Sequence, residues 1–243
     1  MTATTQPFAT FGPSHLAVLA TSVLLPLVLA AVARRLDSRK FERAVCLFFA
    51  VAVAWAWIYW YVVAEKYGWL TLGDSLPLNL CDWAAAAAIA AFLGRSRRAF
   101  ELAYFWALCG TTQGLLTPDI PYDFPEVRFI QFSVFHGGII AGVLFLVFGM
   151  RMRPHADAVG RVLVWTVGYA AVAGAADALL GVNYGFLRAK PGHASLYDLM
   201  PAWPYYLPVV AGLAVAAVLV FYAPFFALDR LRTRRRPPPS KTE

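Results

Sequence analysis

A thiol and a carboxylate are neighbours at the start of an apolar segment, LPLNLCDWAAAAAIAAFL, which covers residues 76–93. If the segment is helical, Asn79, Cys81 and Asp82 all fall within its first two turns. A thiol becomes a nucleophile when a neighbouring base or cation favours the thiolate. A carboxylate in an apolar helix has to face protein or a water-filled cavity. The segment therefore predicts a lined pocket in which Cys81 could carry out nucleophilic chemistry.

The composition determines which class of protein must build this pocket. Hydrophobic residues make up 60% of the 243 residues and charged residues 14%, and the mean hydropathy is +0.60. This leaves too little polar surface to cover a soluble domain of that length. A helix needs about 20 mostly apolar residues to cross a bilayer. We predict an all-α protein, a seven-transmembrane-helix bundle, from segments 14–33, 41–63, 76–93, 99–117, 129–150, 158–180 and 205–228.

The chain is expected to form a single domain. Residues 1–228 make the seven-helix bundle, and residues 229–243 form a basic, proline-rich cytoplasmic tail. The first apolar segment is preceded by no basic residues and ends in ARR rather than at a small-residue cleavage site. It therefore differs from a signal peptide and is expected to stay as the first helix.

Basic residues are distributed unevenly between the two sets of loops. Of the 21 Lys and Arg residues, 17 lie in or beside the loops after the first, third and fifth segments, or in and beside the tail. Cytoplasmic loops collect Lys and Arg, so we expect the N-terminus outside and the C-terminus in the cytoplasm. The net charge of +7 is spread along one membrane face. It suits anionic lipid headgroups, and no nucleic-acid partner is expected.

With this orientation, polar residues from several segments share one outer layer. Cys81 and Asp82 lie about two turns below the outer surface, and His136 lies about two turns into the fifth segment. Gln113 is in the last outer turns of the fourth segment. His136 is the one histidine at the depth of Cys81 within a predicted span, so it is the candidate base for that thiol. On a helix Cys81 and Asp82 are about 100° apart, so both face one pocket only if the third helix is buried on more than one side.

The same layer continues at the end of the sixth segment and into the loop that follows. Asp177 is in the last turn of that segment, and Asn183 and Tyr184 come directly after it. Each candidate also has a structural interpretation. Asp177 would be solvated or cap a loop, His136 would tie helices together, and Cys81 would pack as a small hydrophobe. No Cys or His spacing is typical of a zinc site, so neither a metal nor a cofactor is expected.

Four blocks in order, LPLNLC, YFWALCGTTQGLLTPD, RFIQFSVFHGG and GVNYGFLRAKPGHASLYDLMPAWPYY, resemble the YwaF-like family of bacterial seven-helix membrane proteins, which is related to eukaryotic transmembrane protein 164. That relative is described as a cysteine-dependent acyltransferase that remodels ether phospholipids. The resemblance implies acyl transfer between membrane phospholipids, with Cys81 as nucleophile and His136 as base. The family often has histidine at the position of Asn79 and a small polar residue at that of Asp82, so this chain lacks one possible base.

Three functions fit these residues. In an acyltransferase, Cys81 attacks an ester while His136 takes and returns the proton, and Asn79 and Asp82 polarise the pocket. Gln113 and Asn183 would then donate hydrogen bonds to the oxyanion. In a transporter or proton-coupled carrier, Asp82, His136 and Asp177 form a relay and Cys81 is incidental. The third function is a non-catalytic lipid-binding protein, for which the aromatic loop around Tyr184 would be an interfacial anchor.

Overall fold

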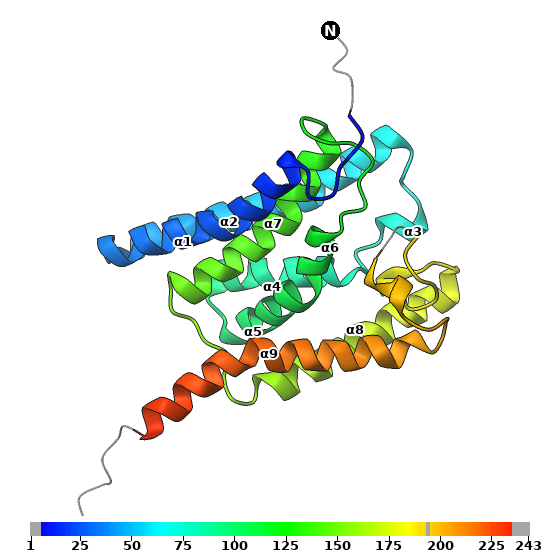
Figure 1. Cartoon of the computed structure of the whole chain (residues 1–243). Helices are drawn as coiled ribbons and strands as arrows, with labels where there is room; N and C mark the ends of the chain where they lie inside the picture. The colour runs from blue at the N-terminus through cyan, green and yellow to red at the C-terminus, as the bar shows by residue number, and fades with distance from the viewer. Residues whose placement is uncertain (1–5, 193–194, 235–243) are drawn as a thin grey trace, which may run out of the picture.

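The protein is mainly helical over the residues that its computed structural model describes, 6–192 and 195–234 (Figure 1). Within those residues, the extended pairing is limited to an isolated bridge between Pro7 and Tyr122. The helices are α1 (Pro13–Leu36), α2 (Arg39–Tyr67), α3 (Leu72–Ser75), α4 (Leu80–Gly94), α5 (Arg97–Trp106), α6 (Thr112–Leu116), α7 (Val127–Phe148), α8 (Ala158–Leu180) and α9 (Tyr206–Arg234). A π-helical turn, Ala107–Thr111, joins α5 to α6 without a break, and two short 3-10 turns, Tyr184–Phe186 and Leu196–Leu199, lie between α8 and α9.

Five helices of the described chain, α1, α2, α7, α8 and α9, are long and apolar enough to cross a membrane. This confirms the prediction of an all-α, multi-pass membrane protein. The other two predicted segments take different forms. The third is the 15-residue helix α4, and the fourth is the continuous run of α5, the π-helical turn and α6.

The third predicted segment begins four residues later than the sequence indicated. Residues 76–79 are a loop, because Pro77 disfavours a helical conformation at Leu76 and Asn79 has the extended backbone of a helix N-cap. Helix α9 differs at its other end and continues to Arg234, beyond the predicted start of the tail at residue 229. Residues 235–243 of that tail lie outside the described part of the chain.

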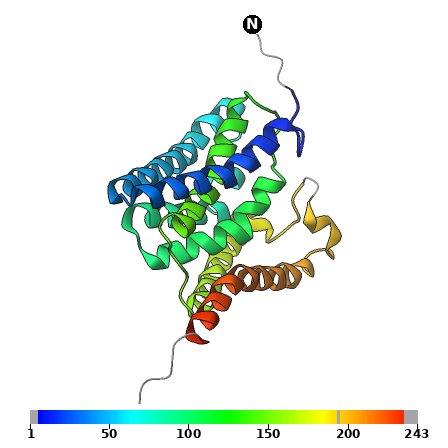
Figure 2. The same cartoon turned by 60° about the vertical axis from the view of Figure 1, so that its left-hand side comes forward.

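Helix α7 is the centre of the bundle. It packs against α1, α2 and α4, and Figures 1 and 2 show it enclosed by these helices. Small residues allow the close approach: a side chain at Gly142 would meet the ring of Phe92 from α4. Such small-residue contacts are the usual way in which membrane helices come together. Helices α8 and α9 lie on the far side of α4 and α5, away from α1 and α2 (Figures 1 and 2).

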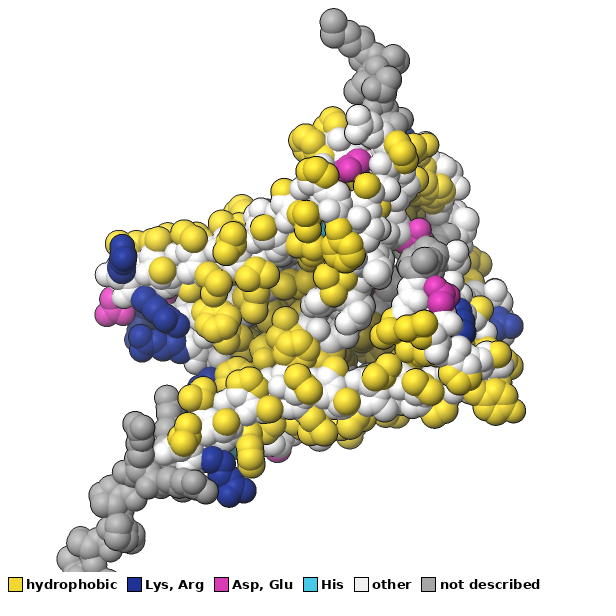
Figure 3. Space-filling view, in the orientation of Figure 1, with side chains coloured by type: hydrophobic (Ala, Val, Ile, Leu, Met, Phe, Trp, Pro, Cys, Tyr) yellow, Lys and Arg dark blue, Asp and Glu magenta, His cyan; other side chains and the backbone are white. Residues whose placement is uncertain are grey.

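Charged side chains gather at one end of the bundle, which we call the basic end. It is the end where α1 meets α2, α4 meets α5 and α7 is followed by α8, and Figure 3 shows its Lys and Arg beside surfaces that are mainly apolar. Ion pairs join these connections: Arg95 lies 3.5 Å from Glu42, and Arg161 lies 2.9 Å from Glu101. At the opposite end, Tyr67 at the end of α2 donates a hydrogen bond to Glu126, the N-cap of α7.

Replacing Gly142 with alanine should destabilise the fold. The new Cβ would lie 2.3 Å from the end of the Phe92 ring, which is only 3% exposed and has little room to move. Overpacking of this kind costs about 1–3 kcal/mol. Thermal unfolding of the detergent-purified protein measures the loss. Gly168→Ala is the control, because no atom lies within 4 Å of its added Cβ; equal melting temperatures for the two variants would contradict the packing assigned to α7 and α4.

Candidate functional site

Asp82 and Asn79 cap the N-terminus of α4. The Asp82 carboxylate accepts a hydrogen bond of 3.0 Å from the Asn79 backbone N–H, and the Asn79 side chain returns the interaction to the Asp82 backbone. Such a capping box satisfies two N–H groups that a helix start leaves free. The side chain of Trp57 in α2 also hydrogen-bonds to this carboxylate. A carboxylate is therefore present beside the thiol for a structural reason: it closes the helix start and ties it to α2.

Cys81 is half-buried and contacts the hydroxyl of Thr111. Thr111 is the last residue of the π-helical turn. Thr111 is fully buried. A π-helical turn inserts one extra residue, which rotates the helix that follows by about 100° relative to an uninterrupted α-helix. This rotation determines that Thr111 faces α4, and it determines which residues of α6 face α7.

His136 has one ring nitrogen bound and the other directed at α6. Its Nδ1 lies 3.1 Å from the Phe132 carbonyl oxygen, and its ring stacks on the Phe132 ring with 4.0 Å between centroids. A carbonyl only accepts hydrogen bonds, so this contact places the proton of the neutral ring on Nδ1 and leaves Nε2 with a lone pair. The Nε2 edge faces Gly114, since a Cβ there would lie 3.5 Å from that nitrogen. The arrangement suits a base.

Cys81 and His136 therefore both contact the segment Thr111–Gly114. Residues at positions i and i+3 share one helix face, with Cβ atoms about 5–6 Å apart, so the thiol and the imidazole approach the same face about one turn apart. No hydrogen bond joins them within the described residues, and their pairing stays a prediction. Neither the groove between α4, α5 and α8 described below nor a second groove between α1, α2 and α7 is lined by either residue. Gln113 lies within this segment, directly before Gly114, and is exposed.

Asp177, Asn183 and Tyr184 belong to a second polar cluster, which anchors the loop between α8 and α9. Asp177 is fully buried, and its Oδ1 accepts a 2.7 Å hydrogen bond from the Tyr184 backbone N–H. The Asn183 amide bonds to the backbone of Arg188 and Ala189 through both its oxygen and its nitrogen. The structural interpretation of Asp177 as a loop cap is thus the one its contacts support.

The hydroxyl of Tyr184 ties this loop to α3. It accepts a 2.9 Å bond from Leu76 N–H and donates a 2.5 Å bond to the Leu72 carbonyl oxygen. The loop therefore also positions the chain that leads into Cys81.

Tyr169 of α8, which sequence reasoning missed, lies between the two clusters. Its ring packs edge-on against Trp83 with 5.5 Å between centroids, and its hydroxyl is within electrostatic range of Cys81, Asp82 and Asp177. Two buried atoms, the Tyr169 hydroxyl and Asp177 Oδ2, have no hydrogen-bond partner among the described residues. Tyr169 carries little signal in the sequence, because an aromatic residue in an apolar helix most often packs in the core.

A comparison with protein families matches the TMEM164 family model to residues 10–222. The chain belongs to the TMEM164 family. The match confirms the resemblance read from the four sequence blocks, and it covers both polar clusters of this TMEM164-family protein. No curated protein and no solved structure matches the chain.

Removing the Tyr184 hydroxyl should loosen the contact between the α8–α9 loop and α3. Tyr184→Phe leaves the Leu76 N–H and the Leu72 carbonyl without their partner, and each hydrogen bond lost costs about 0.5–1.5 kcal/mol. Faster proteolysis of the loop and a lower melting temperature would report the loss. Tyr205→Phe is the control, because Tyr205 is 72% exposed. Equal behaviour of the two variants would show that the hydroxyl does not hold the loop.

Proposed function

We propose that this protein is a membrane-embedded acyltransferase acting on phospholipids, with Cys81 as the nucleophile and His136 as the base. One observation carries the proposal: Nε2 of His136 has a lone pair directed at the Thr111–Gly114 face, which the Cys81 thiol also contacts. The fold family and the apolar helices supply the lipid setting. A base at this position could take the thiol proton over a short path.

The reaction has two balanced halves. The Cys81 sulfur attacks the carbonyl carbon of a donor ester, the carbon–oxygen bond breaks, and the departing oxygen receives the proton that His136 took from the thiol. The acyl group is then held as a thioester. An acceptor hydroxyl loses its proton to His136 and attacks the thioester, and the carbon–sulfur bond breaks. The sulfur takes the proton back, so the enzyme is regenerated.

Gln113 is the candidate donor to the oxyanion. It is exposed on α6, next to the glycine that His136 faces. Asn183 suits this role less well than the sequence suggested, because its amide already bonds to backbone groups of its own loop. Asn79 and Asp82 contribute by fixing the first turn of α4, and with it the position of Cys81. A hydrogen bond to the developing oxyanion stabilises the transition state most when its donor is already held in position, so the fixed first turn of α4 matters for catalysis.

A proton-coupled carrier is the second candidate, and a specific observation favours it. The buried Tyr169 hydroxyl and Asp177 Oδ2 lack hydrogen-bond partners among the described residues, and Tyr169 is within electrostatic range of Asp82. Buried polar groups are usually satisfied, so these atoms suit a water or a proton in transit. In this function Cys81 would be incidental.

Both functions use the same topology, which is part of the proposal: seven crossings of a bacterial plasma membrane, with the N-terminus outside. The five long helices, α4, and the run from α5 to α6 make the seven crossings. Support comes from the gathering of basic residues at one end of the bundle (Figure 3).

Reporter tags at the two termini should appear on opposite sides of the membrane, because an odd number of crossings separates them. Alkaline phosphatase and fluorescent-protein fusions expressed in bacteria distinguish the sides. The N-terminal fusion should be active outside and the C-terminal fusion inside. Both termini in the cytoplasm would remove one crossing and overturn the topology.

An acyl-phosphonate or activated-ester probe should label the purified protein at Cys81. His136→Ala should lower the labelling rate by about 10²–10⁴, the usual contribution of a general base. Intact-protein mass spectrometry followed by peptide mapping locates the label. Cys109→Ser is the matched control, because Cys109 is also half-buried but is not assigned a histidine base. This variant should be labelled at Cys81 as the wild type is.

Turnover with a defined donor and acceptor lipid separates the two functions. Cys81→Ser should abolish acyl transfer and keep the fold, because a hydroxyl is similar in size but far less acidic than a thiol. A carrier would give the opposite pattern, with Cys81→Ser nearly silent and Asp177→Asn blocking proton flux. Full acyl transfer by Cys81→Ser would falsify the enzyme proposal.

A further inference from the structure

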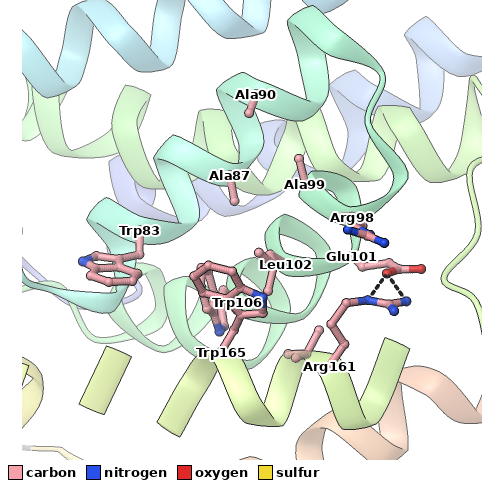
Figure 4. A pocket seen from close by; sticks show the side chains of 11 residues that line it. Trp83, Ala87, Ala90, Arg98, Ala99, Glu101, Leu102, Trp106, Arg161 and Trp165 are labelled. Atoms are coloured by element: carbon pink, nitrogen blue, oxygen red, sulfur yellow. Dashed lines mark hydrogen bonds and ion pairs between the residues drawn. The ribbon is translucent and has the colours of Figure 1, made fainter. Parts of the chain in front are cut away.

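A groove opens between α4, α5 and α8, away from the polar clusters (Figure 4). It encloses about 390 Å³, which is in the lower part of the range for small-molecule sites. Its walls are mostly apolar. Ala87 and Ala90 of α4 leave the space open on one side, and Trp106 and Trp165 border it on the other. Neither Cys81 nor His136 lines this groove.

The groove has charge at one end only. Figure 4 shows Arg98, Glu101 and Arg161 together there, at the basic end of the bundle. Glu101 is 1% exposed and already bound: it accepts hydrogen bonds of 2.9 Å from Arg161 Nη2 and 2.9 Å from the His155 backbone N–H. Its negative charge is therefore balanced inside the protein.

The positive charge of Arg161 is also balanced inside the protein, whereas that of Arg98 is not. Arg161 bonds both to Glu101 and to Asp157 at the start of α8. Hydrogen bonds from Arg161 and His155 hold the pKa of Asp157 below its usual value, so Asp157 stays ionised. Arg98 is exposed and makes no ion pair with any described residue. The mouth of the groove therefore carries one spare positive charge.

Trp83 closes the opposite end. Its ring packs edge-on against Trp106, with 6.3 Å between centroids, and against Tyr169. From Trp83 to Ala90 the helix rises about 10 Å, so the groove follows about two turns of α4. Its neighbouring surface faces lipid, because Val164 and Trp165 of α8 are 72% and 50% exposed on a helix that can cross a membrane. An elongated apolar ligand with one anionic end fits this shape and charge.

We propose that this groove binds one acyl chain of an anionic phospholipid, with the lipid phosphate at Arg98 and the chain running along the groove toward Trp83. Basic pockets between membrane helices are suited to anionic headgroups, and a guanidinium hydrogen-bonds well to phosphate. The second acyl chain of the lipid stays in the bilayer, since the groove has room for one. This site is separate from the proposed acyl-transfer site and does not depend on it.

The occupant also bears on the first turn of α4. Trp83 follows Asp82 directly in the chain, and its ring contacts Tyr169. A chain that fills the groove packs against the Trp83 ring, which lines it. Binding therefore supports the turn that carries Cys81 and Asp82, with no contact between the lipid and the thiol.

Lipid retention by the detergent-purified protein tests the proposal. The protein is incubated with phosphatidylglycerol or phosphatidylcholine of equal chain length, and bound lipid is counted by native mass spectrometry. Phosphatidylglycerol should be retained more strongly. Arg98→Gln should weaken its retention by about fivefold, the effect of one basic residue near an anionic headgroup. Arg97→Gln is the matched control, because Arg97 is an exposed neighbour that does not line the groove. An equal loss in the two variants would show a general charge effect and overturn the site.

The acyl-chain part of the proposal has its own control. Ala90→Leu fills the groove and should reduce retention of phosphatidylglycerol, whereas Ala86→Leu adds the same side chain to an exposed position outside the groove. If Ala90→Leu fails to fold, a comparison of chain lengths on the wild-type protein still tests whether the groove binds an acyl chain. A six-carbon-chain phosphatidylglycerol should be retained far less than the long-chain lipid, and equal retention would reduce the site to a phosphate contact. Cys81→Ser should bind as wild type does, which separates this outcome from that of the acyl-transfer proposal.

Discussion

The shortness of α4 is the constraint on which the candidate site depends. Its 15 residues span about 22 Å, less than the roughly 30 Å of a bilayer core, so in the proposed topology one end stops within the apolar layer. Free N–H groups are costly there, because no water is present to bond them. The box between Asn79 and Asp82, with the bond from Trp57, satisfies that helix start. A polar turn is thereby placed at depth, and Cys81 is part of it.

The π-helical turn has a complementary effect on the opposite wall. The extra residue rotates α6, and the buried Thr111 and the small Gly114 come to face the thiol and the imidazole respectively. A larger residue at position 114 would fill the space beside His136 Nε2. The site is therefore built from two irregularities, a capped helix start and a π-helical turn, each held by helices that pack on α7.

The sequence predicted the features that depend on long apolar runs, and missed those that depend on local irregularity. The five long helices could be predicted because each run of apolar residues is long enough to cross a bilayer. The start of α4 could not be placed from hydropathy, since residues 76–78 are as apolar as the helix itself. The sequence also had no signal for the π-helical turn, which arises from packing. Asp177 could not be read as buried, because its partner is a backbone N–H seven residues away.

The two ends of α4 use charge in opposite ways. At its start, Asp82 is committed to a backbone N–H and to Trp57, so its charge serves to hold a turn. Beyond its other end, Glu101 and Arg161 neutralise each other inside the protein, whereas Arg98 at the mouth of the groove makes no ion pair with a described residue. A buried ion pair whose hydrogen bonds are all made has no charge left to bind a ligand. An unpaired cation at the edge of an apolar groove can bind an anionic group. Recognition of an anionic lipid then depends on this asymmetry and not on the total charge of the basic end.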